Sequence, residues 1–284
     1  MWLKNKISKF RTNRRKKRDY NFFLTTQTNI VLKDQLNAMS KERTRALNIL
    51  GNGDSLRDAM LHLDSSADYM VLNGMVKSPF YQQLKPKYYV LADPGFFHTN
   101  KAFDGISMTR EILEKTTWPM TLFVPWTHTR NVDWLQSTEF VQVVKVNDSN
   151  YFGPEEYRQY CYEHNLAMPN VENVLVMCLY IGMYIGYKDI HLYGFEHSWT
   201  RYLYVNNDNF VCLHDSHFYD SPNLQDEIQY KGDGQPFKMH EILRMYADMF
   251  AAYWDVRILA NKKNVKIINY SPNSFIDAFG KEKV

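Results

Sequence analysis

The sequence predicts an α/β protein built on a mainly parallel, doubly wound sheet. Short apolar runs alternate with helical patterns along most of the chain, which is typical of consecutive βαβ units. With 284 residues, 45% of them hydrophobic, the chain is long enough for one large domain with a sizeable core. The apolar run 46–50 ends in Gly51-Asn52-Gly53, and a helical pattern follows. This order of strand, tight turn and helix is typical of an open α/β sheet.

The elements follow one another from residue 30 onward. A polar helix over 30–45 leads into the first strand. Runs of short apolar residues predict strands at 46–50, 69–73, 88–92, 120–124, 140–146, 189–193 and 265–268. Helical spacing of apolar residues predicts helices at 54–63, 107–115, 132–137, 172–185 and 238–261.

The stretch 195–236 is irregular and rich in Asn, Asp, His and Tyr, with a flexible turn cluster at 231–236. A connection of this length inside a compact α/β domain is usually a functional lid or a disordered excursion. We interpret about 198–237 as a lid. The domain organisation that follows is an N-terminal extension over residues 1–45 and a single domain over 46–284.

The basic residues are concentrated at the N-terminus. Residues 1–18 contain nine Lys and Arg and no acid, whereas the rest of the chain has 25 basic and 31 acidic residues. An acidic body argues against a nucleic-acid-binding protein. Because Trp2, Leu3, Ile7 and Phe10 share one helical face, we expect residues 1–24 to contact an anionic membrane surface. A disordered tail and an RNA-binding arm are the alternatives.

No apolar stretch approaches ~20 residues, and the N-terminus lacks the apolar core of a signal peptide. The three cysteines show no Cys-x-x-Cys spacing and no disulfide framework, which favours a reducing compartment. We therefore expect a cytoplasmic protein, peripheral on the inner face of the cell membrane.

Ligands of open α/β sheets bind beyond the carboxyl ends of the strands, so the turn at 51–55 is the first candidate site. Gly51 and Gly53 would let the backbone approach a phosphate or sugar, and a helix N-terminus would favour an anion. The turn matches neither the dinucleotide nor the ATP fingerprint. The alternative is an ordinary strand–helix turn with Asp54 as the N-cap. Similar polar turns follow the other strands, at 73–74, 93–95, 125–126, 194–197 and 271–274.

Three stretches together resemble the bacterial sialyltransferases that use CMP-sialic acid, the Campylobacter-type enzymes. Residues 51–56, Gly-Asn-Gly-Asp-Ser-Leu, resemble the Gly-Asn-Gly-Pro-Ser-Leu turn of that family. Residues 172–194 are similar to its long helix, Gly-Tyr-Lys turn and following strand, and 270–274 resemble its Cys-Pro-Asn-Ser segment. The resemblance covers 46–279. The wider group includes flagellin-modifying nonulosonate transferases and archaeal hydroxymethylpterin diphosphokinases.

The resemblance implies a Rossmann-like, GT-A-variant-like nucleotide-sugar domain with a lid. It implies an inverting glycosyltransferase that uses no metal and no other cofactor, and the sequence contains no Asp-x-Asp. The expected donor is a nucleotide sugar, with a CMP-linked nonulosonic acid favoured. The expected acceptor is a glycan or lipid-linked glycan of a bacterial surface polysaccharide, capsule or lipopolysaccharide. An oligomer is compatible with the sequence.

The resemblance also implies a set of donor-binding residues. Asn52 and Ser55 would hold the nucleotide phosphate or sugar. Asp54 stands where the family has Pro, and Asn173-Val174 stand where it has Ser/Thr-Gly. The whole implied donor site consists of Gly51, Asn52, Gly53, Ser55, Asn73, Asp93 (Asn in the family), Asn173, Glu196 (Asp in the family) and His197.

The catalytic residues are also assigned by resemblance. The base that takes the acceptor proton follows the lid in that family, and here His240 follows the turn cluster and opens the last long helix. His214 and His217, inside the lid, are competing candidates, and with Asp215 they would also permit a metal site. Tyr204 would steady the leaving phosphate, and Tyr202 is equally reachable.

Two other functions stay open. A pterin-type diphosphokinase would need Mg²⁺ held by acidic residues such as Asp54, Asp93 and Glu196, because diphosphoryl transfer requires charge neutralisation. A non-catalytic binding protein on the membrane surface is the third possibility, since a fold alone does not prove a function.

Overall fold

A single parallel sheet organises the computed structural model, which describes residues 16–17, 19–21, 23, 35–99, 104–213, 227–231 and 234–283. Its eight strands lie in the order β11-β10-β6-β1-β2-β3-β4-β5, and every neighbouring pair is parallel. The strands are β1 Leu47–Leu50, β2 Asp68–Leu72, β3 Tyr88–Val90, β4 Met120–Pro125, β5 Val141–Val146, β6 Asp189–Tyr193, β10 Lys266–Asn269 and β11 Gly280–Lys281. All seven predicted strands are confirmed. So is the predicted fold class.

The chain winds outward from β1 in both directions. It runs through β2 to β5 on one side, then returns to place β6 on the other side of β1. The β1–β6 boundary is therefore a topological switch point, the place where open α/β sheets bind ligands.

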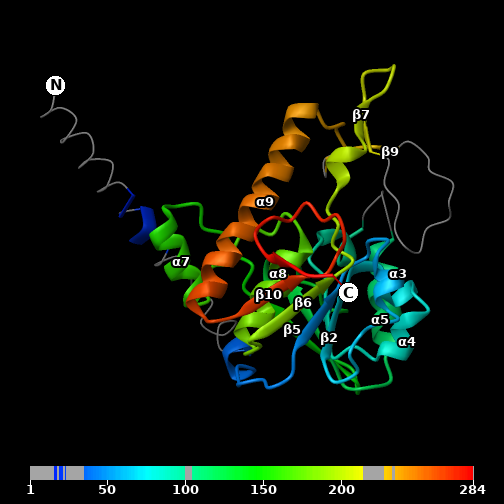
Figure 1. Ribbon diagram of the computed structural model, residues 1–284, viewed down its shortest axis with the longest axis vertical. Helices are drawn as coiled ribbons and strands as arrows, with labels where there is room; N and C mark the ends of the chain where they lie inside the picture. Colours follow the sequence, from blue (N-terminus) through cyan, green and yellow to red (C-terminus); the bar gives the residue numbers. More distant parts are fainter. Residues whose placement is uncertain are drawn as a thin grey trace, which may run out of the picture.

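Helices cover both faces of the sheet (Figure 1). The face packed by α7 (Glu155–Glu163), α8 (Val174–Tyr184) and α9 (Met239–Lys262) holds one hydrophobic cluster. The other face, covered by α3 (Leu56–Ala59), α4 (Phe80–Leu84) and α5 (Gly105–Lys115), holds a second. Strand β1 contributes Leu47 and Ile49 to the first cluster and Leu50 to the second, because successive side chains of a strand alternate between faces. All residues of α8 are buried, so it forms the centre of the first cluster.

The predicted helices at 107–115, 172–185 and 238–261 correspond to α5, α8 and α9. The prediction of a helix at 132–137 is wrong. The nearest helix is α6, Trp126–Thr129, which ends before this segment and is followed by turns. Val132 and Leu135 are both buried, and one turn buries residues at that spacing without a helix. The helix predicted at 54–63 is only four residues long in the structure, as α3; turns follow it, and Leu61 is 81% exposed. Short 3₁₀ turns η1 (Asn73–Lys77), η2 (Pro94–Phe96) and η3 (Trp199–Arg201) complete the helical elements.

The end of the predicted extension packs onto the domain. Residues 35–38 are helical and Leu36 is buried in the first cluster, but 40–45 are not helical. The Arg43 N–H donates to the Gly186 carbonyl and its Nε to the Ile185 carbonyl, which holds this segment extended against the turn after α8. Further upstream, the Tyr20 ring stacks on the Tyr157 ring of α7 at 4.5 Å. The predicted apolar face of Trp2, Leu3, Ile7 and Phe10 lies outside the described residues.

Of the helices in the described ranges, none combines the length and the apolar character that a bilayer crossing requires. The predicted lid is more regular than expected. It contains a small antiparallel sheet of β7 (Leu203–Val205), β8 (Val211–Leu213) and β9 (Glu227–Ile228), seen at the top of Figure 1. The prediction of an irregular 195–236 is therefore wrong for these segments. Asp215 and the lid histidines His214 and His217 lie outside the described residues.

Candidate functional site

The turn after β1 packs tightly against the turn after β6. The Gly51 N–H donates to the Tyr193 carbonyl at 2.8 Å, and the Gly53 N–H donates to the Gly194 carbonyl at 3.0 Å. A Cβ at Gly51 would lie 2.2 Å from the Gly194 oxygen, and one at Gly53 would lie 1.6 Å from Glu196 Oε2. The two glycines are therefore needed for contact between the two turns. At Gly51, which does not line the cavity described below, the missing Cβ makes room for the other turn and not for a ligand.

The helix after this turn offers little to an anion. Helix α3 has four residues, and the Ser55 N–H at its start donates to Glu196 Oε1 at 3.2 Å. Its N-cap is Ser55, so the alternative with Asp54 as the N-cap is also wrong. Because Gly51, Gly53 and Ser55 all donate to protein atoms, the predicted set of unpaired backbone N–H groups is not found at these three residues.

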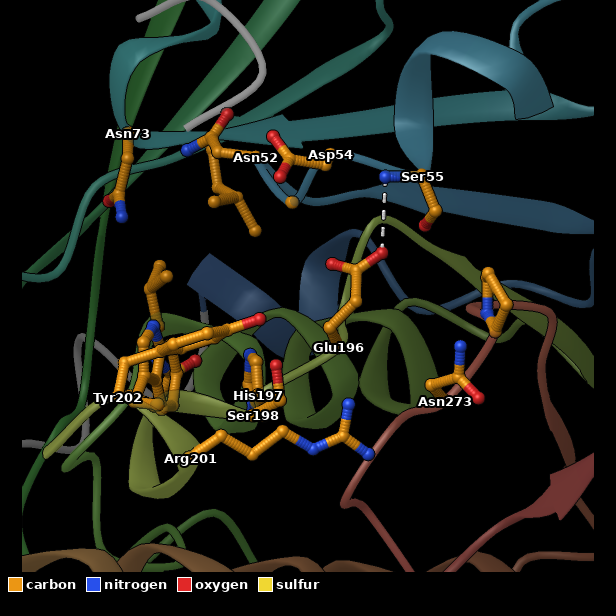
Figure 2. A pocket seen from close by; sticks show the side chains of 16 residues that line it. Asn52, Asp54, Ser55, Asn73, Glu196, His197, Ser198, Arg201, Tyr202 and Asn273 are labelled. Carbon is orange, nitrogen blue, oxygen red and sulfur yellow. Dashed lines mark hydrogen bonds between the residues drawn. The ribbon is translucent and has the colours of Figure 1, made fainter. Parts of the chain in front are cut away.

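A cavity of about 470 Å³ opens beyond the carboxyl ends of β1, β2, β6 and β10, at the switch point (Figure 2). It brings together seven of the predicted donor-site residues from segments more than 100 positions apart. These are Asn52, Gly53, Ser55, Asn73, Asn173, Glu196 and His197. Residues that the sequence analysis did not single out for the donor site also line it, namely Asp54, Leu72, Val174, Ser198, Trp199, Arg201, Tyr202, Pro272 and Asn273.

The remaining predicted residues lie elsewhere. Asp93 lines a neighbouring cavity of about 450 Å³ that shares Asn73 and Asn173 with the first, and its carboxylate accepts the Gly95 N–H at 2.7 Å. Tyr204 lies in β7 and is not among the lining residues, whereas Tyr202 is. His240 is exposed in the first turn of α9 and does not line this cavity, whereas Met245, Tyr246 and Met249 of the same helix line another cavity.

Two side-chain oxygen atoms in the turn after β1 have no hydrogen-bond partner among the described residues. Asn52 Oδ1 and Ser55 Oγ are both buried, yet neither makes a hydrogen bond. A buried polar atom without a partner costs about 1–3 kcal/mol. Since both side chains line the cavity, a ligand with hydroxyl or amide groups would satisfy them.

His197 is the most constrained side chain of the site. It is 7% exposed, its backbone is left-handed at φ 47°, and its ring stacks on the Trp199 ring at 4.4 Å. Its Nδ1 lies 3.0 Å from the Tyr253 hydroxyl of α9. Burial lowers the pKa of His197 to about 3, so the imidazole is neutral at physiological pH.

Acidification is expected to destabilise the protein through His197. An unfolded histidine takes up a proton near about pH 6.5, while the folded state resists protonation down to a pKa of about 3. Between these values the unfolded state binds more protons, so the free energy of unfolding falls as the pH falls through this window. NMR titration of the imidazole checks the cause directly, since the His197 ring should stay neutral from pH 8 to pH 4. A His197 that titrates near pH 6.5 in the folded protein would contradict the prediction.

Arg201 is a site residue that was not predicted from the sequence. It is the only Lys or Arg among the described residues that line the cavity. Its segment, Ser198 to Tyr202, matches no phosphate-binding pattern and fell inside the predicted lid. The only sequence signal was its position just after the carboxyl end of a central strand.

The described residues contain no group of three or more His, Cys, Asp or Glu side chains that could hold a metal ion. Asp93, one of the three acids expected to hold Mg²⁺ in a diphosphokinase, faces the neighbouring cavity, and Glu196 binds the Ser55 N–H. The described part of the chain therefore does not assemble the acidic ligand set of that alternative.

Comparison with known proteins assigns no family to the chain. No family model matches the sequence, and no curated protein matches it. Among solved structures, the chain is similar to the sialyltransferase CstII from Campylobacter jejuni, solved in complex with the substrate analogue cytidine-5'-monophosphate. The identity is 15%, the alignment covers 85% of this chain and 86% of that chain, and the TM-score is 0.46. A likeness at that level does not assign an activity.

Proposed function

We propose that the chain is a glycosyltransferase that moves a sugar from a nucleotide donor to a hydroxyl group of an acceptor. The observation that carries the proposal is convergence. The three stretches that resemble sialyltransferase motifs are far apart in the sequence, yet Asn52, Asn173 and Asn273, one from each, line the same cavity. Turns that follow parallel strands meet at one edge of a sheet, and the switch point is where such an edge binds a ligand.

The reaction proposed is a direct displacement with inversion. The acceptor oxygen bonds to the anomeric carbon, the bond from that carbon to the donor phosphate breaks, and the acceptor proton goes to a base. His240 and His217 are the proposed bases, and Tyr202 or Tyr204 is proposed to steady the leaving phosphate. His197 is less suited to be the base, because an imidazole with a pKa of about 3 holds a proton poorly.

The donor and acceptor are proposed from the sequence resemblance. They are a CMP-linked nonulosonic acid and a glycan or lipid-linked glycan of the bacterial surface. Contact with an anionic membrane is a further proposal, which rests on the nine basic residues at 1–18.

Calorimetric titration with CMP, UDP, GDP and ATP, each with and without Mg²⁺, tests the proposal. Binding of CMP in the absence of Mg²⁺ is expected. ATP binding that requires Mg²⁺ would favour the diphosphokinase instead, and the absence of any nucleotide binding would favour a non-catalytic role. Release of free sugar from the donor that binds is then the first activity to measure.

Asn52→Ala and Ser55→Ala are expected to weaken binding of the favoured nucleotide without unfolding the protein. Each removes a buried polar atom that has no protein partner among the described residues. Loss of one hydrogen bond to a neutral ligand group costs about 1 kcal/mol, or roughly fivefold in Kd. Titration of each variant measures the change, and thermal melting checks the fold. Unchanged affinity in both variants would remove this turn from the binding site.

A further inference from the structure

The cavity has two chemically different sides. Figure 2 shows Asn52 and Asp54 along one side, and Arg201 and His197 along the other. The first side carries negative charge and an unused acceptor, since the Asp54 carboxylate lies there and Asn52 Oδ1 beside it has no partner among the described residues. Glu196 adds a second carboxylate, which reaches the Ser55 N–H of that same turn.

Arg201 gives the opposite side its charge. Its guanidinium lies over the Phe275 ring at 4.7 Å, and no ion pair joins it to an acidic residue in the described ranges. Stacking fixes the plane of a guanidinium and leaves the N–H groups at its edge directed outward. Arg201 is therefore a positioned donor group at the cavity wall.

His197 adds a neutral donor on the same side. The Tyr253 hydroxyl is fully buried, and His197 Nδ1 is its only hydrogen-bond partner among the described residues. A phenol in that setting donates its proton to Nδ1, since the opposite arrangement would leave the buried hydroxyl hydrogen unpaired. The imidazole proton is then on Nε2. Nε2 points away from Tyr253 because the two ring nitrogens are on opposite edges.

We propose that the phosphate of the bound nucleotide lies against Arg201 and the Nε2–H of His197, with the hydroxyl groups of ribose or sugar facing Asn52 and Glu196. An anion at the turn after β1 would meet the carboxylates of Asp54 and Glu196. The backbone N–H groups of Gly51, Gly53 and Ser55 in that turn already donate to protein atoms. On the opposite side of the cavity, Arg201 and His197 would offer the anion hydrogen-bond donors only. This assignment rests on the proposed function. It places the phosphate on the side of the cavity opposite to the turn Gly51–Ser55, where the sequence pattern predicts it.

The test separates phosphate binding from nucleoside binding. The ratio of the Kd of cytidine to the Kd of CMP measures what the phosphate contributes, and another nucleoside pair replaces these if the nucleotide panel favours it. Arg201→Gln is expected to reduce this ratio by about 10-fold or more, with the cytidine Kd unchanged. Asn52→Ala is expected to weaken both ligands equally and to leave the ratio unchanged. Arg110→Gln on α5 removes the same charge away from the cavity and serves as the control.

The outcomes separate this inference from the proposed function. If no nucleotide binds the wild type, the proposed function and the inference both fail. If CMP binds but Arg201→Gln keeps the wild-type ratio, or if Asn52→Ala reduces it, the inference alone is overturned. A wild-type ratio near one overturns it as well, since the phosphate then contributes nothing.

The histidine has its own readout. Nitrogen NMR of the full chain is expected to show His197 protonated on Nε2, and Tyr253→Phe is expected to remove this preference and lower the phosphate contribution. His197→Asn tests the same group in a residue that tolerates a left-handed backbone. It is expected to lower the ratio while keeping the cytidine Kd. A proton found on Nδ1, or an unchanged ratio in both folded variants, excludes His197 from the phosphate site.

Discussion

Gly51→Ala is expected to lower the free energy of unfolding by about 3 kcal/mol. The new Cβ would lie 2.2 Å from the Gly194 carbonyl oxygen and 2.9 Å from the Phe195 ring. The oxygen belongs to the backbone, so relief of this contact requires the turns after β1 and β6 to separate. Moving the two turns apart would lengthen the hydrogen bond that the Gly51 N–H donates to the Tyr193 carbonyl. Chemical denaturation of the variant measures the loss.

Gly280→Ala is the matched control. Its Cβ would meet the Ile267 carbonyl oxygen at 3.9 Å, which is an ordinary contact. The same substitution in β11 should therefore change stability by less than about 1 kcal/mol. Equal losses at Gly51 and Gly280 would show that the tight contact between the two turns is not what requires glycine at 51.

Replacement of the general base is expected to lower kcat by about 10² to 10⁴-fold. We expect one of His240→Ala and His217→Ala to show this loss at saturating donor, with donor affinity nearly unchanged. A third histidine, His197, is less suited to be the base. His197 lines the cavity, but its buried imidazole is held neutral and bound to Tyr253.

A pH profile distinguishes a base from a structural residue, because only loss of the base removes the acidic limb of kcat. His62→Ala, at an exposed position outside the cavity, is the control. If both His240→Ala and His217→Ala retain more than about a tenth of kcat, neither is the base and the proposed mechanism needs another group.

The sequence was most informative where local pattern and burial agree. Runs such as 47–50 and 120–124 carry one polar residue each, Asn48 and Thr121, and are otherwise apolar because central parallel strands are buried on both faces. Helix α8 was predictable for a similar reason, since its apolar residues are continuous and Asn173 caps it by accepting the Leu175 N–H. Helix α7 was missed because it is rich in polar residues and its buried face includes Gln159, which breaks the apolar periodicity.

For the site, the sequence by itself determined which turns follow the strands, and seven of the nine residues predicted for the donor site line one cavity. Only the tertiary structure decided what each residue does there. Gly51 and Gly53 are glycines because another turn lies against them, and Glu196 occupies a backbone N–H that the sequence pattern left open. The state of His197 depends on Tyr253, which is 56 positions away in the chain. A local pattern records the conformation of its own backbone, whereas the charge and proton position of a side chain depend on neighbours that only folding brings within hydrogen-bond distance.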